Sequence, residues 1–181
     1  MLPANAIRQN MRRRRCAVGQ GAQKRASYEL AMNILQTEIY RESRHIAFYL
    51  ANEGEIGLGF LLKKAWSQGK TCYLPVIEKE RLAFVNYTPT TPLESNKYGI
   101  LEPVSGSIIA ACSLDLVLTP LVAFDKYNHR IGMGGGYYDK TFERGGSKRR
   151  ALMMGVAYYF QQVRKITPEP WDVPLDCVVT N

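Results

Sequence analysis

The sequence predicts a three-layer α/β/α fold, in which helices cover both faces of a mostly parallel central sheet. Short apolar runs alternate along the chain with helical patterns, and residues 45–77 read as strand, helix and strand in succession. A glycine-rich stretch also connects the apolar run 116–124 to a segment compatible with helix. With 181 residues the chain is long enough for one substantial core. We therefore expect a single Rossmann-like domain over residues 1–181.

The N-terminal part is predicted to be helical. Residues 4–15 permit a basic helix, and residues 20–41 permit a longer one. The apolar positions of the longer helix that we expect to face the core are Tyr28, Ala31, Ile34 and Leu35.

The clearest helix follows a predicted buried strand at residues 45–50. Its apolar positions recur at i, i+3, i+4, i+7 and i+8, and they are Leu58, Leu61, Leu62, Ala65 and Trp66. Gly69 can end this helix, and residues 71–77 form the next strand. Because the connections are short, the two strands should be parallel, with a right-handed crossover.

The second half of the chain contains further strands, separated by less regular segments. We predict these strands at residues 82–87, 114–119, 151–157 and 177–180. The threonine- and proline-rich segment 88–92 is irregular, and it leads through Tyr98 to residues 102–103 as a lid or wall. The second of these strands is expected to lead to the glycine-rich loop, after which residues 137–144 are compatible with helix. In such sheets, ligands bind at the carboxyl ends of strands.

The net charge of +8 is concentrated in the N-terminal arm. Most of it comes from Arg8, Arg12, Arg13, Arg14 and Arg15. No basic patch interleaved with aromatic residues, of the kind that nucleic-acid-binding proteins use, is evident elsewhere in the sequence. We therefore expect no nucleic-acid partner, and we expect the last four of these arginines to lie on a solvated helix face.

Cysteine usage and hydropathy favour a reducing cytoplasm. The scattered cysteines have no spacing typical of a disulfide framework or a zinc site, and they are Cys16, Cys72, Cys112 and Cys177. The longest charge-free stretch, residues 151–163, is shorter than the roughly 18 residues of a membrane span. The basic N-terminus lacks the sustained apolar core of a secretory signal. An arginine-rich organelle-targeting peptide is still an alternative for this segment. We expect a cytoplasmic monomer without a membrane partner.

The stretch Arg130-Ile-Gly-Met-Gly-Gly-Gly-Tyr-Tyr-Asp139 is the strongest candidate for a binding site. Its glycines leave almost no side chain, so a ligand can approach the backbone amides. Arg130 can clamp an anion, the tyrosines offer stacking faces, and Asp139 can bind a hard cation. A dinucleotide-binding fingerprint would need glycine at Tyr137, and a Walker loop would need lysine after the last glycine. The stretch is either a phosphate-binding loop of another kind or a glycine-rich turn without function.

The sequence contains no evident catalytic nucleophile. It lacks a G-x-S-x-G elbow, and His45 and His129 are too few for a triad or a metal cluster. We interpret His45 as structural and His129 as solvent-exposed in a polar turn. Phosphoryl transfer between two bound substrates fits this pattern, because it needs positioning, magnesium and cationic donors rather than a nucleophile.

Residues 124–139 resemble the signature of the 5-formyltetrahydrofolate cyclo-ligase family, whose members are also called methenyltetrahydrofolate synthetases. Further segments that carry the resemblance are Arg8 with the arginines after it, residues 48–56, residues 98–103 and residues 171–176. These segments fall in the family's order and at its spacings, so the resemblance covers nearly the whole chain.

The resemblance implies a ligase that converts 5-formyltetrahydrofolate and ATP to 5,10-methenyltetrahydrofolate, ADP and phosphate. In this reaction the formyl oxygen attacks the γ-phosphate, nitrogen 10 then attacks the activated carbon, and phosphate leaves. Mg²⁺ is the implied cofactor. The implied partners are small molecules, namely ATP, 5-formyltetrahydrofolate and its polyglutamates.

The resemblance also assigns site residues. For ATP these are Ala4, Arg8, Arg130, Ile131, Gly132, Met133, Gly134, Gly135, Gly136, Tyr137 and Tyr138. For the folate they are Leu50, Glu55, Tyr98, Met133, Gly134, Gly135, Gly136 and Tyr137, with Glu55 accepting from the pterin amino group. Asp139 and Asp176 would hold magnesium. Without the resemblance, Leu50 is typical of a core residue and Glu55 of a loop carboxylate.

The chain departs from the animal members of the family. Those members carry arginine and lysine where this chain has Met133 and Gly135, and lysine where it has Ala4. Arg130 and Arg8 are therefore the cations that we expect at the transferring phosphoryl group, with Arg130 as the catalytic residue.

Two other classes of protein stay open at this point. A phosphate- or RNA-binding regulator would explain the basic arm and the glycine loop, but it would need neither Asp139 nor Asp176 and would not turn over ATP. An isomerase or acyl-CoA transferase on a related α/β scaffold would act without ATP.

Overall fold

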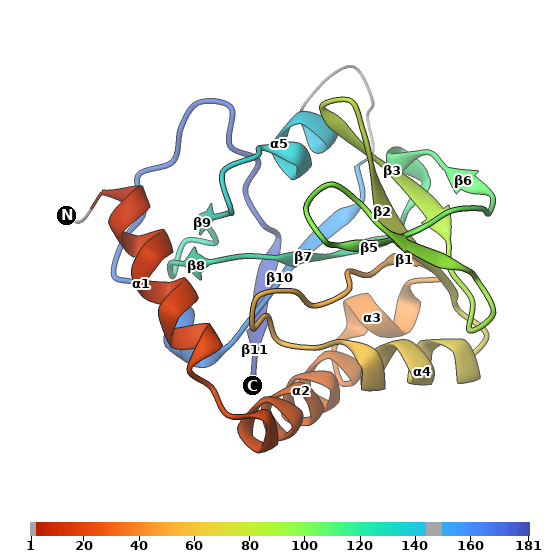
Figure 1. Ribbon diagram of the computed structural model, residues 1–181, viewed down its shortest axis with the longest axis horizontal. Helices are drawn as coiled ribbons and strands as arrows, with labels where there is room; N and C mark the ends of the chain where they lie inside the picture. Colours follow the sequence, from red (N-terminus) through yellow and green to blue (C-terminus); the bar gives the residue numbers. More distant parts are fainter. Residues whose placement is uncertain (1–2, 144–149) are drawn as a thin grey trace.

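A central seven-stranded sheet organises the protein, and a computed structural model describes residues 3–143 and 150–181 (Figure 1). The strands lie in the order β11-β10-β7-β1-β2-β3-β6. Their bounds are β1 His45–Ala47, β2 Thr71–Glu78, β3 Arg81–Asn86, β6 Ile108–Ile109, β7 Leu116–Pro120, β10 Leu152–Ala157 and β11 Cys177–Thr180. The five strands from β11 to β2 pair in parallel, whereas β3 pairs antiparallel with both β2 and β6. The predicted mostly parallel sheet is confirmed, and so is the parallel pairing of β1 with β2.

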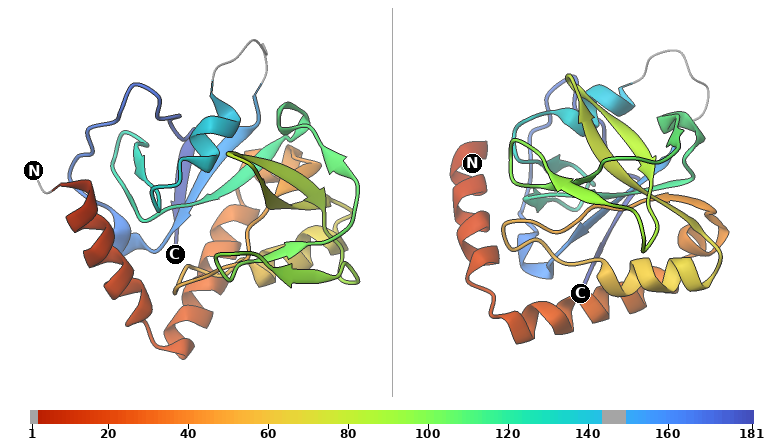
Figure 2. Two further views of the ribbon diagram at one scale, coloured as in Figure 1. Left: turned by 45° about the horizontal axis from the view of Figure 1, so that its top comes forward. Right: turned by 45° about the vertical axis from the view of Figure 1, so that its right-hand side comes forward.

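Helices cover both faces of this sheet, as Figures 1 and 2 show. The helices of the first face are α2 Gln20–Leu35, α3 Glu38–Glu42 and α4 Gly59–Ser67. The opposite face is covered by α5 Tyr137–Phe142 together with the coil near Val173 and Leu175. The second helical layer is therefore thin, because its described helix has only six residues.

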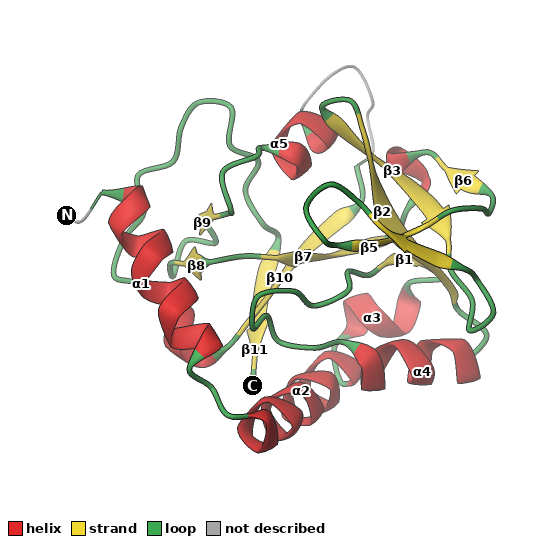
Figure 3. Cartoon of the chain, in the orientation of Figure 1, coloured by secondary structure: helices red, strands yellow, loops and turns green. Residues whose placement is uncertain are grey.

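Helix α1, Ala4–Cys16, packs beside the hairpin of β8 Ala123–Phe124 and β9 Arg130–Ile131 rather than on a face of the sheet. Its apolar residues Ile7 and Met11 are buried against this hairpin. Figure 3 shows α1 and the hairpin at the same end of the molecule. The remaining elements are β4 Leu93–Ser95, β5 Leu101–Pro103, and the 3-10 turns Ala111–Ser113 and Tyr159–Gln161.

The helix predicted over residues 20–41 is two helices. The side chain of Thr37 accepts a hydrogen bond from the backbone of Tyr40 at 3.2 Å, and this N-cap begins α3 where α2 has ended. Ala31 and Ile34 are buried as predicted. The prediction for Tyr28 was wrong, because its side chain is 51% exposed and meets the ring of Phe60 edge-on.

Two short hairpins were not predicted. The hairpin of β8 and β9 lies between β7 and the glycine loop, where the sequence suggested a direct connection. The wall after segment 88–92 contains the second hairpin, formed by β4 and β5. Strands of two or three residues are too short to show hydrophobic periodicity, so the sequence held no signal for them.

Candidate functional site

A cavity of about 970 Å³ opens at the carboxyl ends of the parallel strands. Its walls include Leu50 after β1, Leu74 and Pro75 of β2, and Leu121 after β7. This position is the one expected for a ligand in an open α/β sheet. The volume lies at the upper end of the range for small-molecule sites, so the cavity can take a large ligand or two adjacent ones.

The structure brings all the residues predicted for ATP and folate to this one cavity. They are Ala4, Arg8, Leu50, Glu55, Tyr98, Arg130, Ile131, Gly132, Met133, Gly134, Gly135, Gly136, Tyr137 and Tyr138. Asp139 lines the cavity as well, whereas Asp176 does not. Residues separated by more than a hundred positions in the sequence therefore share one space.

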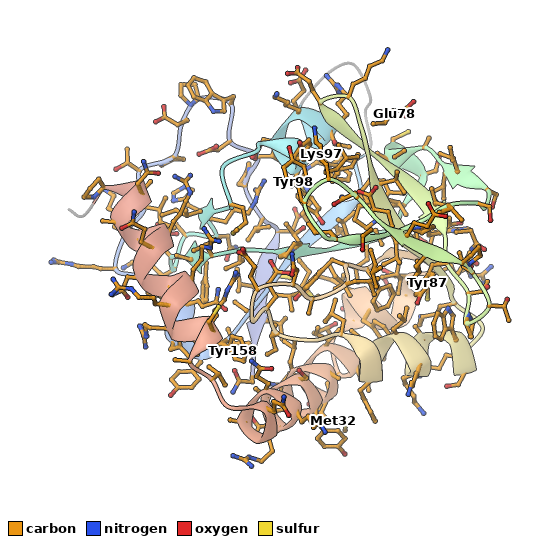
Figure 4. All side chains as sticks on the ribbon, in the orientation of Figure 1. Met32, Glu78, Tyr87, Lys97, Tyr98 and Tyr158 are labelled. Atoms are coloured by element: carbon orange, nitrogen blue, oxygen red, sulfur yellow. The ribbon has the colours of Figure 1, made fainter. Side chains whose placement is uncertain are left out.

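The glycine loop, residues 132–136, lines the cavity. It connects β9 to α5 and lies between α1 and the hairpin of β4 and β5 (Figures 1 and 2). Tyr98, labelled in Figure 4, is on this hairpin, and its hydroxyl is 3.1 Å from that of Tyr137. Arg8 of α1 therefore contacts the loop at Gly132, whereas Tyr98 of the hairpin contacts it at Tyr137.

Two glycines of the loop differ in whether the fold requires glycine at their positions. Gly136 has φ of 65°, in the left-handed region that favours glycine, and it is the N-cap of α5. At Gly132, by contrast, a Cβ atom would meet no other atom within 4 Å. The fold does not require glycine there. The missing side chain at Gly132 instead leaves room inside the cavity.

Arg130 is held by two partners at the start of the loop. Its Nη2 lies 2.5 Å from Oδ1 of Asp139, and its Nη1 donates to the carbonyl oxygen of Val173. The backbone N–H of Val173 in turn donates to the same carboxylate at 3.0 Å. The Arg130 side chain is only 6% exposed. In this arrangement its charge faces Asp139. Both guanidinium Nη groups can therefore bind a phosphate only when that ion pair opens.

Arg8 is the freer of the two predicted cations. Its Nε donates to the carbonyl oxygen of Gly132 at 2.8 Å, and its Nη1 donates to Asn5 at 2.7 Å. Its Nη2 makes no hydrogen bond to any residue that the structure describes. Arg8 is therefore fixed against the glycine loop with a donor left for an anion.

Sequence reasoning assigned no role to Lys165 or Trp171, both of which line the cavity with exposed side chains. Lys165 precedes Ile166, whose N–H donates to the buried carboxylate of Asp125 at 2.8 Å. No motif includes this lysine, so only the fold could place it here.

Asp125 also corrects the prediction for His129. The imidazole Nδ1 of His129 lies 3.1 Å from Asp125, and its side chain is 28% exposed rather than free in solvent. Burial alone would raise the pKa of Asp125, but hydrogen bonds from the Ile166 N–H and from His129 bring the pKa below its usual value. This carboxylate ties the turn before Arg130 to the segment that carries Lys165.

Glu55 presents a nearly buried carboxylate, with a side chain that is 14% exposed. Its Oε2 accepts a hydrogen bond from the N–H of Asn52 at 3.1 Å. Burial raises the pKa of Glu55, while the Asn52 N–H and the charge of Arg15 oppose this rise. A carboxylate held in this way at the cavity wall can accept hydrogen bonds from an amino group.

The expected solvation of the α1 arginines was wrong for Arg15. Its side chain is 1% exposed, and its Nη1 lies 3.7 Å from Oε1 of Glu55. The other three, Arg12, Arg13 and Arg14, are exposed as predicted. One sequence signal could have found the difference: Arg15 follows Arg8 by seven residues, which places both on one face of a helix.

The two predicted magnesium ligands lie in different surroundings. Both carboxylate oxygens of Asp176 are 2.7 Å from nitrogens of Arg150, and the N–H of Met153 donates to one of them. Asp176 thus joins the starts of β10 and β11 and stands outside the cavity lining. The described residues hold no group of three or more acidic, histidine or cysteine side chains arranged for a metal ion. Of the two predicted ligands, Asp139 alone lines the cavity, and magnesium commonly takes one or two carboxylates together with phosphate oxygens.

The fold and the cavity define the class of protein as an α/β small-molecule-binding protein, whose cavity is lined by a glycine loop, cations and a nearly buried carboxylate. No helix in the described ranges is long and apolar enough to cross a membrane.

Comparison with known proteins identifies the family. The model of the 5-formyltetrahydrofolate cyclo-ligase family matches residues 3–181. The 5-formyltetrahydrofolate cyclo-ligase of Haemophilus influenzae is 38% identical over 174 residues, which cover 93% of this chain and 92% of the relative. The Escherichia coli K12 protein of the same name is 34% identical over 175 residues, which cover 94% and 96%.

A solved structure agrees with these matches. The NMR structure of Aquifex aeolicus 5,10-methenyltetrahydrofolate synthetase superposes with a TM-score of 0.84 at 28% identity, over 98% of this chain and 89% of the other. This chain belongs to the 5-formyltetrahydrofolate cyclo-ligase family and is a ligase of folate one-carbon metabolism. The resemblance seen in the sequence is confirmed, and family membership favours a ligase over a regulator or an isomerase.

Proposed function

We propose that the protein converts 5-formyltetrahydrofolate and ATP to 5,10-methenyltetrahydrofolate, ADP and phosphate. The observation that carries this proposal is that the residues predicted for ATP and those predicted for the folate line one continuous cavity. Direct phosphoryl transfer between two substrates requires their reacting atoms to be held in contact, and a shared cavity allows this.

ATP occupies the side of the glycine loop that faces α1. Gly132 leaves space for phosphate beside the backbone, and the free Nη2 of Arg8 can donate to it. Lys165 adds a flexible charge on the same side. Because α5 has only six residues, these cations rather than a helix dipole supply most of the attraction.

The folate occupies the other side, against Glu55 and the apolar wall. The carboxylate of Glu55 accepts hydrogen bonds from the pterin amino group, while Leu50 and Leu74 contact the ring. Tyr98, which is 53% exposed, closes the edge of the site. A charge-assisted bond of this kind contributes about 1.5–3 kcal/mol when it is buried.

The reaction runs in two displacements. The formyl oxygen on nitrogen 5 attacks the γ-phosphorus, and ADP leaves with the bonding electrons. Nitrogen 10 then attacks the formyl carbon and gives up its proton, and phosphate leaves with the former formyl oxygen. Arg8 and Arg130 stabilise the charge that builds on the transferring group, because fixed donors act strongly in a site that excludes water.

Asp139 would hold magnesium by its carboxylate, and the ion when bound supplies charge neutralisation at the phosphates. The same carboxylate now pairs with Arg130 at 2.5 Å. When its pairing with Asp139 opens, Arg130 can turn its donors to the γ-phosphate.

An oxygen-isotope experiment tests this order of events. 5-Formyltetrahydrofolate labelled with ¹⁸O in the formyl group is turned over with unlabelled ATP in unlabelled water. The proposal requires the label to appear in the released inorganic phosphate, one atom for each methenyl product. Unlabelled phosphate alongside normal product formation would show that the formyl oxygen leaves by another route.

A further inference from the structure

The guanidinium of Arg15 is buried at a place where an unpaired charge would be costly. It donates from Nη1 to the carbonyl oxygen of Leu121 at 3.3 Å, and Oε1 of Glu55 lies 3.7 Å from the same nitrogen. Its Nε and Nη2 have no hydrogen-bond partner among the described residues. An isolated charge in such surroundings costs several kcal/mol, so Arg15 depends on the carboxylate of Glu55 for compensation.

The end of α1 is fitted closely to the loop that carries Glu55. Gly54 has φ of 73°, and a Cβ atom there would lie 2.9 Å from the backbone of Arg15. Beside it, Sγ of Cys16 donates to the carbonyl oxygen of Glu53 at 3.5 Å, and Arg12 pairs with the Glu53 carboxylate at 2.7 Å. These contacts fix the position of Arg15 relative to Glu55.

Several titratable groups surround Glu55 from the elements packed against it. They are Arg15 of α1, Glu53 of its own loop, and the tyrosines Tyr49, Tyr138 and Tyr158. Tyr158 lies beside the C-terminal half of α1 (Figure 4). Arg15 is the only cation in this set, and together with the Asn52 N–H it opposes the effect of burial on the pKa of Glu55.

We propose that Arg15 is a positioning residue for the folate: it keeps the carboxylate of Glu55 ionised and aimed into the cavity. This inference rests on the proposed function, in which Glu55 binds the pterin. Arg8 and Arg15 stand seven residues apart, about 10 Å along one face of α1. One helix face therefore presents an arginine to the glycine loop and a second arginine to the folate carboxylate.

The test is folate binding without ATP, measured by calorimetry over a range of pH. Arg15→Gln keeps a donor for the Leu121 carbonyl and removes the charge, whereas Arg13→Gln is the matched control on the exposed face of the same helix. We expect Arg15→Gln to raise the Kd for 5-formyltetrahydrofolate by about tenfold or more at neutral pH, with ATP affinity unchanged. Arg13→Gln should leave both affinities unaltered.

The pH profile separates positioning from simple structural support. Without Arg15 the pKa of Glu55 rises further, so the pH below which folate binding is lost should move upward in Arg15→Gln. Arg15→Lys keeps the charge and should keep this limit at the wild-type pH. In a Glu55→Gln background, Arg15→Gln should cause no additional loss of folate affinity.

Two results would overturn the inference and leave the proposed function intact. One is a folded Arg15→Gln protein with the Kd and pH limit of the wild type. The other, decisive should Arg15→Gln fail to fold, is an Arg15→Lys protein whose pH limit has moved. Failure of the wild-type protein to bind 5-formyltetrahydrofolate would instead contradict the proposed function itself.

Discussion

At the scale of single residues, Arg130 must change its hydrogen-bond partners before it can take part in the proposed reaction. It is paired with Asp139 and bonded to Val173, so its donors reach a phosphate only after that pairing relaxes. We predict that Arg130→Ala lowers kcat by about a hundredfold or more, with a smaller change in the KM for ATP, because the lost donor acts mainly in the transition state. Steady-state kinetics at saturating folate measure both constants.

Arg130→Lys provides the matched comparison. A point charge cannot reproduce a guanidinium that bonds two partners, so activity should recover only in part. A change confined to the KM for ATP would mean that Arg130 binds ground state and transition state equally. Arg8 would then be the cation at the transferring group.

Gly132 provides a test in which stability and function separate. Because a Cβ atom there meets nothing within 4 Å, we expect Gly132→Ala to leave the thermal melting temperature unchanged. The added methyl group should crowd the phosphate by about 1–3 kcal/mol, which is roughly 5- to 150-fold in the KM for ATP. Gly59→Ala, at another glycine with open space around it, should leave the KM for ATP unaltered. Unaltered ATP kinetics in Gly132→Ala would place the phosphates elsewhere.

Glu55 should act on one substrate only. An amide at this position keeps an acceptor but loses the charge, so Glu55→Gln should raise the KM for the folate more than the KM for ATP. We expect a factor of about ten or more for the folate, from a charge-assisted bond of about 1.5–3 kcal/mol. Since burial raises the pKa of Glu55, wild-type folate affinity should fall on acidification at a higher pH than for an exposed carboxyl, and the variant should lose this dependence. Equal losses for both substrates would indicate a structural role.

At the scale of elements, the pairing of Arg150 with Asp176 joins the starts of β10 and β11. Both oxygens of Asp176 accept hydrogen bonds from Arg150, and one also accepts from Met153. We predict that Asp176→Asn lowers the free energy of unfolding by about 1–3 kcal/mol, because partly buried donors lose their charged acceptor. Denaturant unfolding measures this loss. Glu143→Gln, which removes an exposed ion pair with Arg81, should cost much less.

The same variant tests the magnesium prediction for Asp176. If the carboxylate serves the strands, the magnesium concentration for half-maximal activity should equal that of the wild type. An increased magnesium requirement in Asp176→Asn, with stability preserved, would support Asp176 as a magnesium ligand.

The elements that sequence reasoning found are those with a strong local signal. Helix α4 followed from five apolar positions at helical spacing, and β11 from a short apolar run. The break at Thr37 was missed because the hydrophobic periodicity continues from one helix to the next, so it does not show where the first helix ends. The hairpin of β8 and β9 was missed because its strands have two residues each.

At the scale of the whole molecule, the sequence located most of the cavity through one rule of α/β sheets and one family resemblance. Leu50, Glu55 and the glycine loop all follow strands, and the structure gathers them at one edge of the sheet. Arg15 and Lys165 were missed for a different reason. The spacing from Arg8 could have placed Arg15 on the cavity face of its helix, but its partner Glu55 and the position of Lys165 at the cavity appear only in the folded chain.

In the proposed reaction, ATP and 5-formyltetrahydrofolate react with each other in this cavity. The most direct test is to mix the protein with magnesium, ATP and 5-formyltetrahydrofolate and to follow the absorbance of the methenyl product together with ADP release. We predict product and ADP in equal amounts, and no product when ATP is omitted. Folded protein that forms no methenyl product in the complete mixture, or forms it equally well without ATP, would contradict this reaction.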